Sequence, residues 1–180
     1  MTNNTWRRRL MDRYPEIFPR TPSGDESLYG YAFVGDGWRD LIEVAVERIA
    51  ARAPLGSFRI DRIEEKYGTV VMALQRVQAG LDADILSAVD EAVALAEARS
   101  ASTCQICGAE GVLYDADGWF VTRCAEHAHG VPVPVRPGWD NVELLMVVSG
   151  GHLKVSRARR YDRLTDTFID IDPSTLEVDE

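Results

Sequence analysis

Hydrophobic positions recur at helical spacing in three stretches of this chain of 180 residues. In the first, Trp6, Leu10 and Tyr14 are four residues apart, and Pro15 ends the pattern. The third stretch, residues 81 to 99, has apolar residues on one side and acidic residues in its first turn, where they suit the positive end of a helix dipole. Both stretches are predicted to be helices.

The second stretch begins at a Gly-Asp-Gly-Trp sequence, residues 35–38, and stops before Pro54. Asp36 or Gly37 is suited to cap its beginning. The hydrophobic positions that share one face are Trp38, Leu41, Ile42, Ala45 and Ile49. We therefore expect a helix whose apolar face packs on the core, preceded by a loop at residues 18–30, which are rich in Pro, Gly and Ser.

Strand periodicity appears between the second and third helices. Residues 58–62 alternate between apolar and charged, Tyr67 and Gly68 suit a turn, and residues 69–74 are almost continuously apolar. Strands so close in sequence pair antiparallel. The second strand is expected to be more buried than the first because it lacks polar alternation.

The C-terminal part of the chain has a different composition. Residues 131–138 form a Pro-rich extended connector, and the apolar segment 142–148 has no decisive period, so its type stays open. Residues 153–164 and 165–172 alternate sufficiently to predict a second pair of strands. The acidic end at 177–180 is expected to fray.

The three cysteines of the chain and one of its histidines form two pairs with the same spacing. Two residues separate Cys104 from Cys107, and two separate Cys124 from His127. A Cys-x-x-Cys turn directs two sulfurs at one point, and a second pair completes the tetrahedron that structural zinc prefers. Residues 112–122, which lie between the pairs, have the pattern of two short strands around a turn. The pattern predicts a zinc ribbon.

Other interpretations of these residues stay open. The cysteines could be reduced core residues without a metal, whereas disulfides are disfavoured because their number is odd and no secretory signal is recognised. His129 could replace His127 as the fourth ligand, although His127 repeats the spacing of the first pair. Four ligands leave no open position for water, so a structural metal is expected and a catalytic one is not.

Net charge limits the classes of partner. At pH 7 the formal charge is −9, which disfavours a mainly electrostatic grip on nucleic acid. The positive charge that is present is concentrated near the N-terminus and in the last third of the chain. No apolar run approaches the length of a membrane span. We expect a soluble cytoplasmic protein in a reducing compartment.

Arginines gather at two places in the sequence. They are Arg7, Arg8 and Arg9 in the first predicted helix, and Arg157, Arg159, Arg160 and Arg163 in the C-terminal hairpin. Either cluster could contact a phosphate or an acidic partner. For the first cluster a solvated basic helix face is favoured, and for the second, cross-strand pairing with Asp166, Asp170 and Asp172.

Several short motifs occur in a fixed order, namely RYPEIF, GDGWRDLIE, EEKYGTVVM, TCQICGAEG and GWFVTRCAEHA. In this order they resemble a group of small hypothetical proteins found in phages, prophages and bacteria. The resemblance covers residues 10–129, with RRYDR and TDTFIDI as further points of similarity, and the segment 131–151 departs from it. It implies a mobile-element setting and no established activity. The zinc ligands that it implies are Cys104, Cys107, Cys124 and His127.

These observations together predict an α+β fold, in which a small antiparallel sheet packs with two main helices and a zinc-ribbon hairpin is added. We expect an α+β core at residues 1–100 and a ribbon packed on it at residues 101–130. Residues 131–180 should supply the connector, a β-hairpin and the acidic tail.

The leading functional hypothesis is a non-enzymatic zinc-ribbon protein that binds another protein, such as a host or defence factor met by a mobile element. The alternatives are a nucleic-acid-binding ribbon that uses the arginine clusters, and an unrecognised enzyme. The sequence contains no phosphate-binding loop, no Gly-x-Ser-x-Gly nucleophile elbow and no Rossmann glycine pattern.

Overall fold

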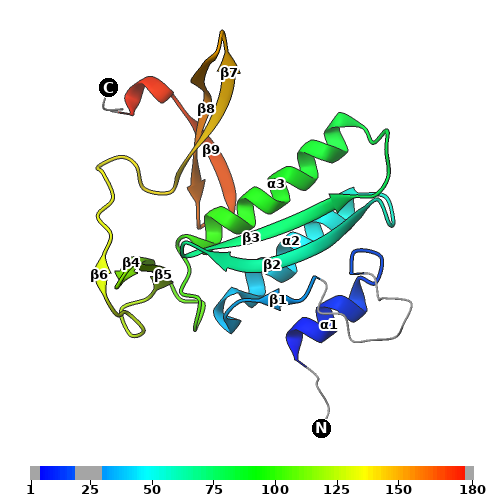
Figure 1. The fold of residues 1–180 in the computed structure, drawn as a ribbon, viewed down its shortest axis with the longest axis horizontal. Coiled ribbons are helices and arrows are strands. Elements are labelled where there is room, and N and C mark those ends of the chain that lie inside the picture. Colours follow the sequence, from blue (N-terminus) through cyan, green and yellow to red (C-terminus); the bar gives the residue numbers. More distant parts are fainter. Residues whose placement is uncertain (1–4, 19–29, 177–180) are drawn as a thin grey trace.

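The computed structural model describes residues 5–18 and 30–176 (Figure 1). Most of the loop expected at 18–30, and the acidic end at 177–180, lie outside these residues. The first predicted helix is confirmed as α1 (Trp6–Arg13), whose beginning is capped by the Thr5 hydroxyl. The described part of the chain contains no helix that is both long and apolar enough to cross a membrane.

A three-stranded sheet and two helices make the core. The predicted antiparallel pair is confirmed as β2 (Phe58–Lys66) and β3 (Thr69–Arg76), and β1 (Ala32–Phe33) adds a short parallel strand beside β2. The other two predicted helices are α2 (Arg39–Arg52) and α3 (Ala83–Ser100). They lie side by side on one face of this sheet (Figure 1), so the fold is α+β as expected.

The predicted apolar face of α2 is the centre of this core. All five of its expected inward residues are buried, and Trp38, Ile42 and Ile49 have no exposed surface. They pack with side chains of α1, β2, β3 and α3 in one continuous cluster. Burial of such side chains contributes roughly 1.5 to 3 kcal/mol each before the entropic cost of folding is counted.

The beginning of α2 differs from the prediction. A single 3₁₀ turn, Asp36–Trp38, precedes the α-helix, and neither Asp36 nor Gly37 caps it with a side chain. The Asp36 carboxylate instead accepts hydrogen bonds from Trp6 Nε1 (2.9 Å) and from the Arg7 guanidinium (2.6 Å). The predicted cap is therefore wrong, because Asp36 ties α1 to this turn.

A second small sheet follows α3. The expected hairpin is formed by β4 (Val112–Ala116) and β5 (Trp119–Arg123), and β6 (Val131–Pro132), in the Pro-rich connector, pairs with the other edge of β4. Asp117 and Gly118 form the turn, both with positive φ. A two-residue turn of this type matches the twist of the strands that it joins.

The C-terminal residues form a third sheet. The two predicted strands are β8 (His152–Asp162) and β9 (Thr167–Ile171). The apolar segment whose secondary structure the sequence left undecided is the strand β7 (Val142–Ser149), which pairs antiparallel with β8. The strand order is β7-β8-β9. The predicted hairpin is thus part of a three-stranded sheet, which stands beside α3 (Figure 1).

Candidate metal centre

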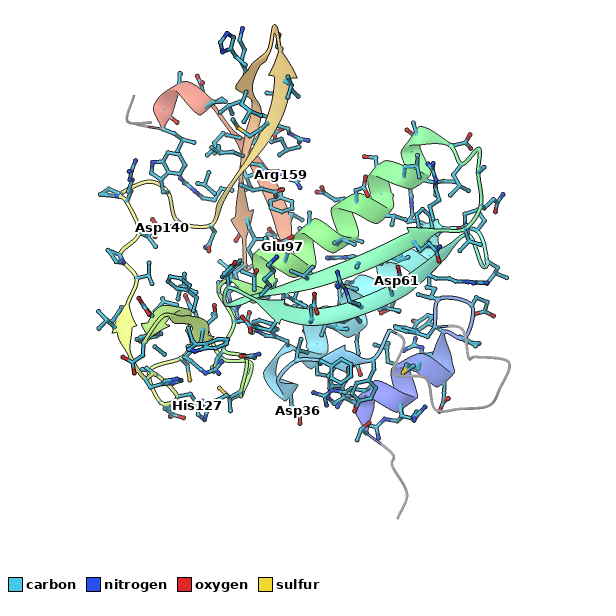
Figure 2. The ribbon with its side chains drawn as sticks, in the orientation of Figure 1. Asp36, Asp61, Glu97, His127, Asp140 and Arg159 are labelled. Atoms are coloured by element: carbon cyan, nitrogen blue, oxygen red, sulfur yellow. The ribbon has the colours of Figure 1, made fainter. Side chains whose placement is uncertain are left out.

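The four predicted ligands lie together at one end of the second sheet. The ligand atoms of Cys104, Cys107, Cys124 and His127 are all within 4.8 Å of one another. Cys104 and Cys124 are buried, and Cys107 is exposed. Figure 2 shows His127 at this place. His129 is exposed and does not belong to this group, so the structure favours His127 over its competitor.

The distances between ligand atoms suit a tetrahedral ion. Zinc–sulfur bonds of about 2.3 Å imply sulfur–sulfur edges of roughly 3.8 Å. The Cys107 and Cys124 sulfurs are 3.6 Å apart, and the His127 Nδ1 atom lies 3.7 Å from the Cys104 sulfur and 3.3 Å from the Cys124 sulfur. This donor set could therefore hold a metal ion with little rearrangement.

Local backbone geometry brings the first pair of cysteines together. The Gly108 amide donates to the Cys104 carbonyl (2.9 Å), and the Cys104 amide donates to the Ala109 carbonyl (2.7 Å). Gly108 has a φ of 80°, which residues with a Cβ rarely adopt. The second pair closes in the same way, because the His127 amide donates to the Cys124 carbonyl (3.1 Å). Both turns direct their ligand atoms toward one point.

The surroundings of two of the cysteines shift the pKa of their thiols in opposite directions. Burial alone would raise the pKa of Cys104, but hydrogen bonds from the backbone at Cys107, Cys124 and Ile106 lower it to about 6. At Cys107 a backbone hydrogen bond from Ala109 acts to lower the pKa, yet burial and the neighbouring sulfurs raise it overall. The thiolate is the form of cysteine that binds metals, and the lowered pKa favours this form at Cys104.

The first cysteine turn packs directly on the turn before α2. The Gly37 amide donates to the Gln105 carbonyl (3.0 Å), and the buried Trp38 indole donates to the Thr103 carbonyl (2.8 Å). A Cβ on Gly37 would lie 2.7 Å from the Cys107 amide nitrogen, and one on Gly35 would collide with Gln105. Only glycine permits this approach.

A second contact joins the ribbon to the turn between β2 and β3. The buried Thr122 hydroxyl of β5 donates to the Gly68 carbonyl (2.7 Å). A Cβ on Gly68 would collide with the Leu113 side chain of β4. The hairpin of β4 and β5 is thereby fixed to the core at both of its strands.

These contacts were missed by sequence reasoning, although the signal was present. The Gly-Asp-Gly-Trp sequence and the Tyr-Gly turn were interpreted as a helix start and a hairpin. In the structure, Gly35, Gly37 and Gly68 are also the places where the core touches the ribbon. Gly35 and Gly37 have no positive φ, and glycines that a turn does not need are a signal of close backbone approach.

The second arginine cluster is largely used within the protein. Arg159 is only 5% exposed and forms ion pairs with Glu91 of α3 and Glu143 of β7. Arg157 binds Asp170 through two hydrogen bonds (2.6 and 3.0 Å), as the cross-strand interpretation predicted.

The remaining predicted pairs differ from that interpretation. Asp166 pairs with Arg48 of α2 (2.8 Å), and the Asp172 carboxylate caps the turn Pro173–Thr175. Arg160 donates to the Gly138 carbonyl (2.7 Å). Arg163 donates to the Ser102 carbonyl (2.9 Å) and so joins the C-terminal sheet to the end of α3. Asp166 thus pairs with an arginine of the core, and Asp172 caps its own turn, so neither forms the predicted cross-strand pair.

In the first cluster, Arg7 is not part of a solvated face. Its guanidinium donates to the Ala32 and Val34 carbonyls and pairs with Asp36. These contacts hold α1 against the strand β1. Arg8 and Arg9 also interact with other groups, so the three arginines do not act as one free basic patch.

An open polar groove lies between the first cysteine turn and the beginning of α2. Its volume is about 460 Å³, and Asp36, Asp40 and Arg99 are among its lining residues. The charged groups that line it pair internally, because Arg99 binds Asp40 and Arg39 binds Glu43 (2.9 Å). The groove therefore presents paired charges to solvent.

The outer face of the ribbon is apolar and aromatic. Successive strand residues point to opposite sides, so the pairing of β4 with β5 places six residues on one side, which are Val112, Tyr114, Ala116, Trp119, Val121 and Arg123. The opposite side carries Leu113 and Thr122, which face the core. Trp119 is 78% exposed. A largely exposed tryptophan thus stands next to the turn at the tip of the ribbon.

Comparisons of the chain with protein-family models, with curated proteins and with solved structures gave no match. The functional argument therefore depends on the residues of the site and their surroundings. Those are a four-residue centre that could hold a metal ion, a ribbon fixed to the core by glycines, and an exposed aromatic face.

Proposed function

We propose that this protein is a non-enzymatic zinc-ribbon protein that acts by binding another protein through the outer face of its ribbon. The observation that carries the proposal is the exposure of Trp119, together with Val112 and Tyr114 on the same side. Exposed tryptophan and tyrosine side chains are the residues most often responsible for binding energy at protein interfaces. Because a rigid ribbon already holds these side chains in place, ordering them when the partner binds costs little conformational entropy.

Zinc is the proposed metal. Three cysteine sulfurs and one imidazole nitrogen are a frequent ligand set of structural zinc. Four protein ligands fill its tetrahedral shell, which leaves no position for an activated water. The metal would stabilise the ribbon and the aromatic face that the ribbon presents, because the binding free energy of a structural zinc is also folding free energy.

Protein is favoured over nucleic acid as the partner because the arginines that could grip phosphates have other contacts. Arg159 is buried between two glutamates, and Arg157 and Arg7 pair with aspartates. A chain with a net charge of −9 also repels the nucleic-acid backbone.

The biological setting is proposed from the motif resemblance alone. The order of GDGW, EKYG and the two metal-binding pairs resembles small phage and prophage proteins. We propose a mobile-element protein that acts in the cytoplasm on a host or defence factor. An acidic protein with a preformed aromatic face suits the binding of a basic or apolar surface.

The proposal is tested by capture from host lysate. Tagged, zinc-loaded protein is incubated with lysate with and without nuclease treatment, and the bound species are identified by mass spectrometry. We expect a protein partner that stays bound after nuclease treatment. Capture of nucleic acid alone, lost after nuclease treatment, would contradict the proposal and favour the nucleic-acid alternative.

A further inference from the structure

One of the four candidate metal ligands faces solvent. The structure describes all three cysteines, and of these only Cys107 is exposed, whereas Cys104 has no exposed surface and Cys124 is 8% exposed. Cys107 also lines the open polar groove of about 460 Å³ beside the beginning of α2. Because oxidation of a cysteine requires that the oxidant reach its sulfur, Cys107 is the cysteine that a small oxidant in solution meets first.

A second sulfur lies within reach of Cys107. The Cys124 sulfur is 3.6 Å away, and a disulfide bond is about 2.0 Å long, so a small movement of the exposed side chain brings the two sulfurs together. Cys104 is held differently, because backbone amides at Cys107, Cys124 and Ile106 donate hydrogen bonds to its sulfur. Such hydrogen bonds stabilise a thiolate and make it a weaker nucleophile. Cys124 is therefore the partner that the geometry selects for Cys107.

The charges around the groove favour a small neutral oxidant. The charged side chains that line it are Asp36, Asp40, Glu43, Arg39 and Arg99. Each of these arginines pairs with a carboxylate of the groove, and Asp36 pairs with Arg7 of α1. Three carboxylates and three guanidinium groups thus balance, and the groove has no net charge with which to attract a charged oxidant. Hydrogen peroxide is neutral and needs no such attraction.

We propose that Cys107 and Cys124 are a peroxide-sensitive thiol pair that opens the metal centre. The Cys107 thiolate attacks hydrogen peroxide, the O–O bond breaks, and the sulfur becomes a sulfenic acid while the departing hydroxide takes a proton to form water. The Cys124 thiolate then attacks the Cys107 sulfur, an S–S bond forms, and a second hydroxide leaves and takes a proton. The two thiolates thus lose two electrons, and the peroxide becomes two molecules of water.

The thiol pair would regulate the metal centre of the proposed function, and it rests on that proposal. The disulfide removes two of the four ligands, so Cys104 and His127 remain. Two ligands are too few for a structural zinc, which takes four. Loss of the ion removes the folding free energy that it supplies to the hairpin of β4 and β5, and a thiol reductant reverses the change.

The test treats the purified, zinc-loaded chain with hydrogen peroxide at neutral pH. Free zinc is followed with a chromophoric chelator, and the disulfide is mapped by mass spectrometry after the remaining thiols are alkylated. We expect about one zinc ion to be released for each Cys107–Cys124 disulfide that forms. Dithiothreitol with added zinc should restore the bound ion.

Two variants identify the responsible side chain. Cys107→His keeps a metal ligand and removes the exposed thiol, so it should hold zinc and release it to peroxide about tenfold or more slowly. Met146→Leu is the matched control, because Met146 is 47% exposed and peroxide also oxidises methionine. Its release of zinc should be as fast as that of the unmodified chain.

Several results would overturn the proposal. They are a disulfide between Cys104 and another cysteine, zinc release without a disulfide, and zinc retained by the unmodified chain at peroxide concentrations that oxidise Met146. A purified chain that carries no zinc would refute the proposed metal, and with it the opening of the centre. A failed partner capture in reducing lysate would instead refute binding by the ribbon face alone, so the two failures are distinguishable.

Discussion

At the scale of single residues, three glycines decide where the ribbon sits. Gly35 and Gly37 allow the first cysteine turn to contact the backbone before α2, and Gly68 allows β4 to contact the turn after β2. Neither Gly35 nor Gly37 has a positive φ, so their backbone conformation does not require glycine. Glycine is required there because a Cβ would collide with neighbouring atoms. A side chain at either position would push against backbone atoms, which cannot rotate away.

Gly37→Ala is predicted to lower the free energy of unfolding by about 2 to 3 kcal/mol, because the added Cβ meets backbone at Cys104 and Cys107. Denaturant unfolding with zinc present measures this change. Gly80→Ala is the control, since that Cβ enters open space and the positive φ alone should cost about 1 kcal/mol. Equal losses in the two variants would show that crowding at Gly37 is not important.

The raised pKa of Tyr161 predicts that the stability of the protein depends on pH. Its pKa is raised by burial first, then by its hydrogen bond to Asp166 (2.7 Å) and the charge of that residue. Folding thus favours the protonated phenol. Its contribution to stability is complete below the ordinary pKa of 10.0 and is lost as the pH rises above it.

Tyr161→Phe should therefore make stability fall less steeply above pH 10 than in the unmodified chain, at a cost of about 1 kcal/mol at neutral pH for the lost hydrogen bond. Unfolding curves at neutral pH and above pH 10 measure both effects. Parallel losses of stability in the two proteins at high pH would contradict the assignment.

At the scale of elements, the C-terminal sheet is attached to the helices by buried charge. Arg159 of β8 lies between Glu91 and Glu143, with its guanidinium 3.7 Å from the centre of the Phe168 ring. Removal of the Arg159 side chain leaves the partly buried carboxylates of Glu91 and Glu143 without this cationic partner. Arg157, two residues earlier, forms its ion pair with Asp170 in solvent.

Arg159→Ala is accordingly predicted to destabilise the protein by about 2 to 3 kcal/mol, and Arg157→Ala by no more than about 1 kcal/mol. Both values come from denaturant unfolding under the same conditions. If the two variants were equally stable, the buried pairs would not attach the sheet.

The hairpin of β4 and β5 is the element that we propose to depend on a metal ion. His127→Ala removes a predicted ligand, and His129→Ala removes an exposed histidine two residues away. Zinc measured by mass spectrometry of the purified protein should be about one ion per chain in the His129 variant and much less in the His127 variant. Hydrogen exchange of β4 and β5 should rise only in the latter, because the metal holds the hairpin. The reverse pattern would assign His129 as the ligand.

At the scale of the whole molecule, three small sheets are held around α3. The ribbon follows directly from its C-terminal end, and the C-terminal sheet returns to it through Arg163 and to α2 through Asp166. No strand of one described sheet pairs with a strand of another. Figure 1 shows the β4–β5 hairpin and the β7–β8 hairpin in different parts of the molecule.

Much of this architecture could be predicted from local pattern. The helices, the β2–β3 and β4–β5 pairs, and the grouping of Cys104 with Cys107, Cys124 and His127 all depend on periodicity and short spacing. What could not be predicted depends on contacts between distant segments.

Three features show this limit. The apolar run of β7 suits a buried helix as well as a strand, and only its pairing with β8 decides. Asp36 suits a helix cap, but Trp6 and Arg7 arrive from another element. Gly37 indicates a close backbone approach, but the local sequence does not identify Cys104 as the residue that lies against it.

The most direct test of the central claim is quantitative capture from nuclease-treated lysate with two variants. Trp119→Ala removes the exposed ring from the ribbon face, and Leu164→Ala removes a side chain that is 96% exposed elsewhere. We predict that the amount of captured partner falls about tenfold or more with Trp119→Ala and is unchanged with Leu164→Ala. Equal capture by the unmodified chain and Trp119→Ala would contradict the claim that the ribbon face binds the partner.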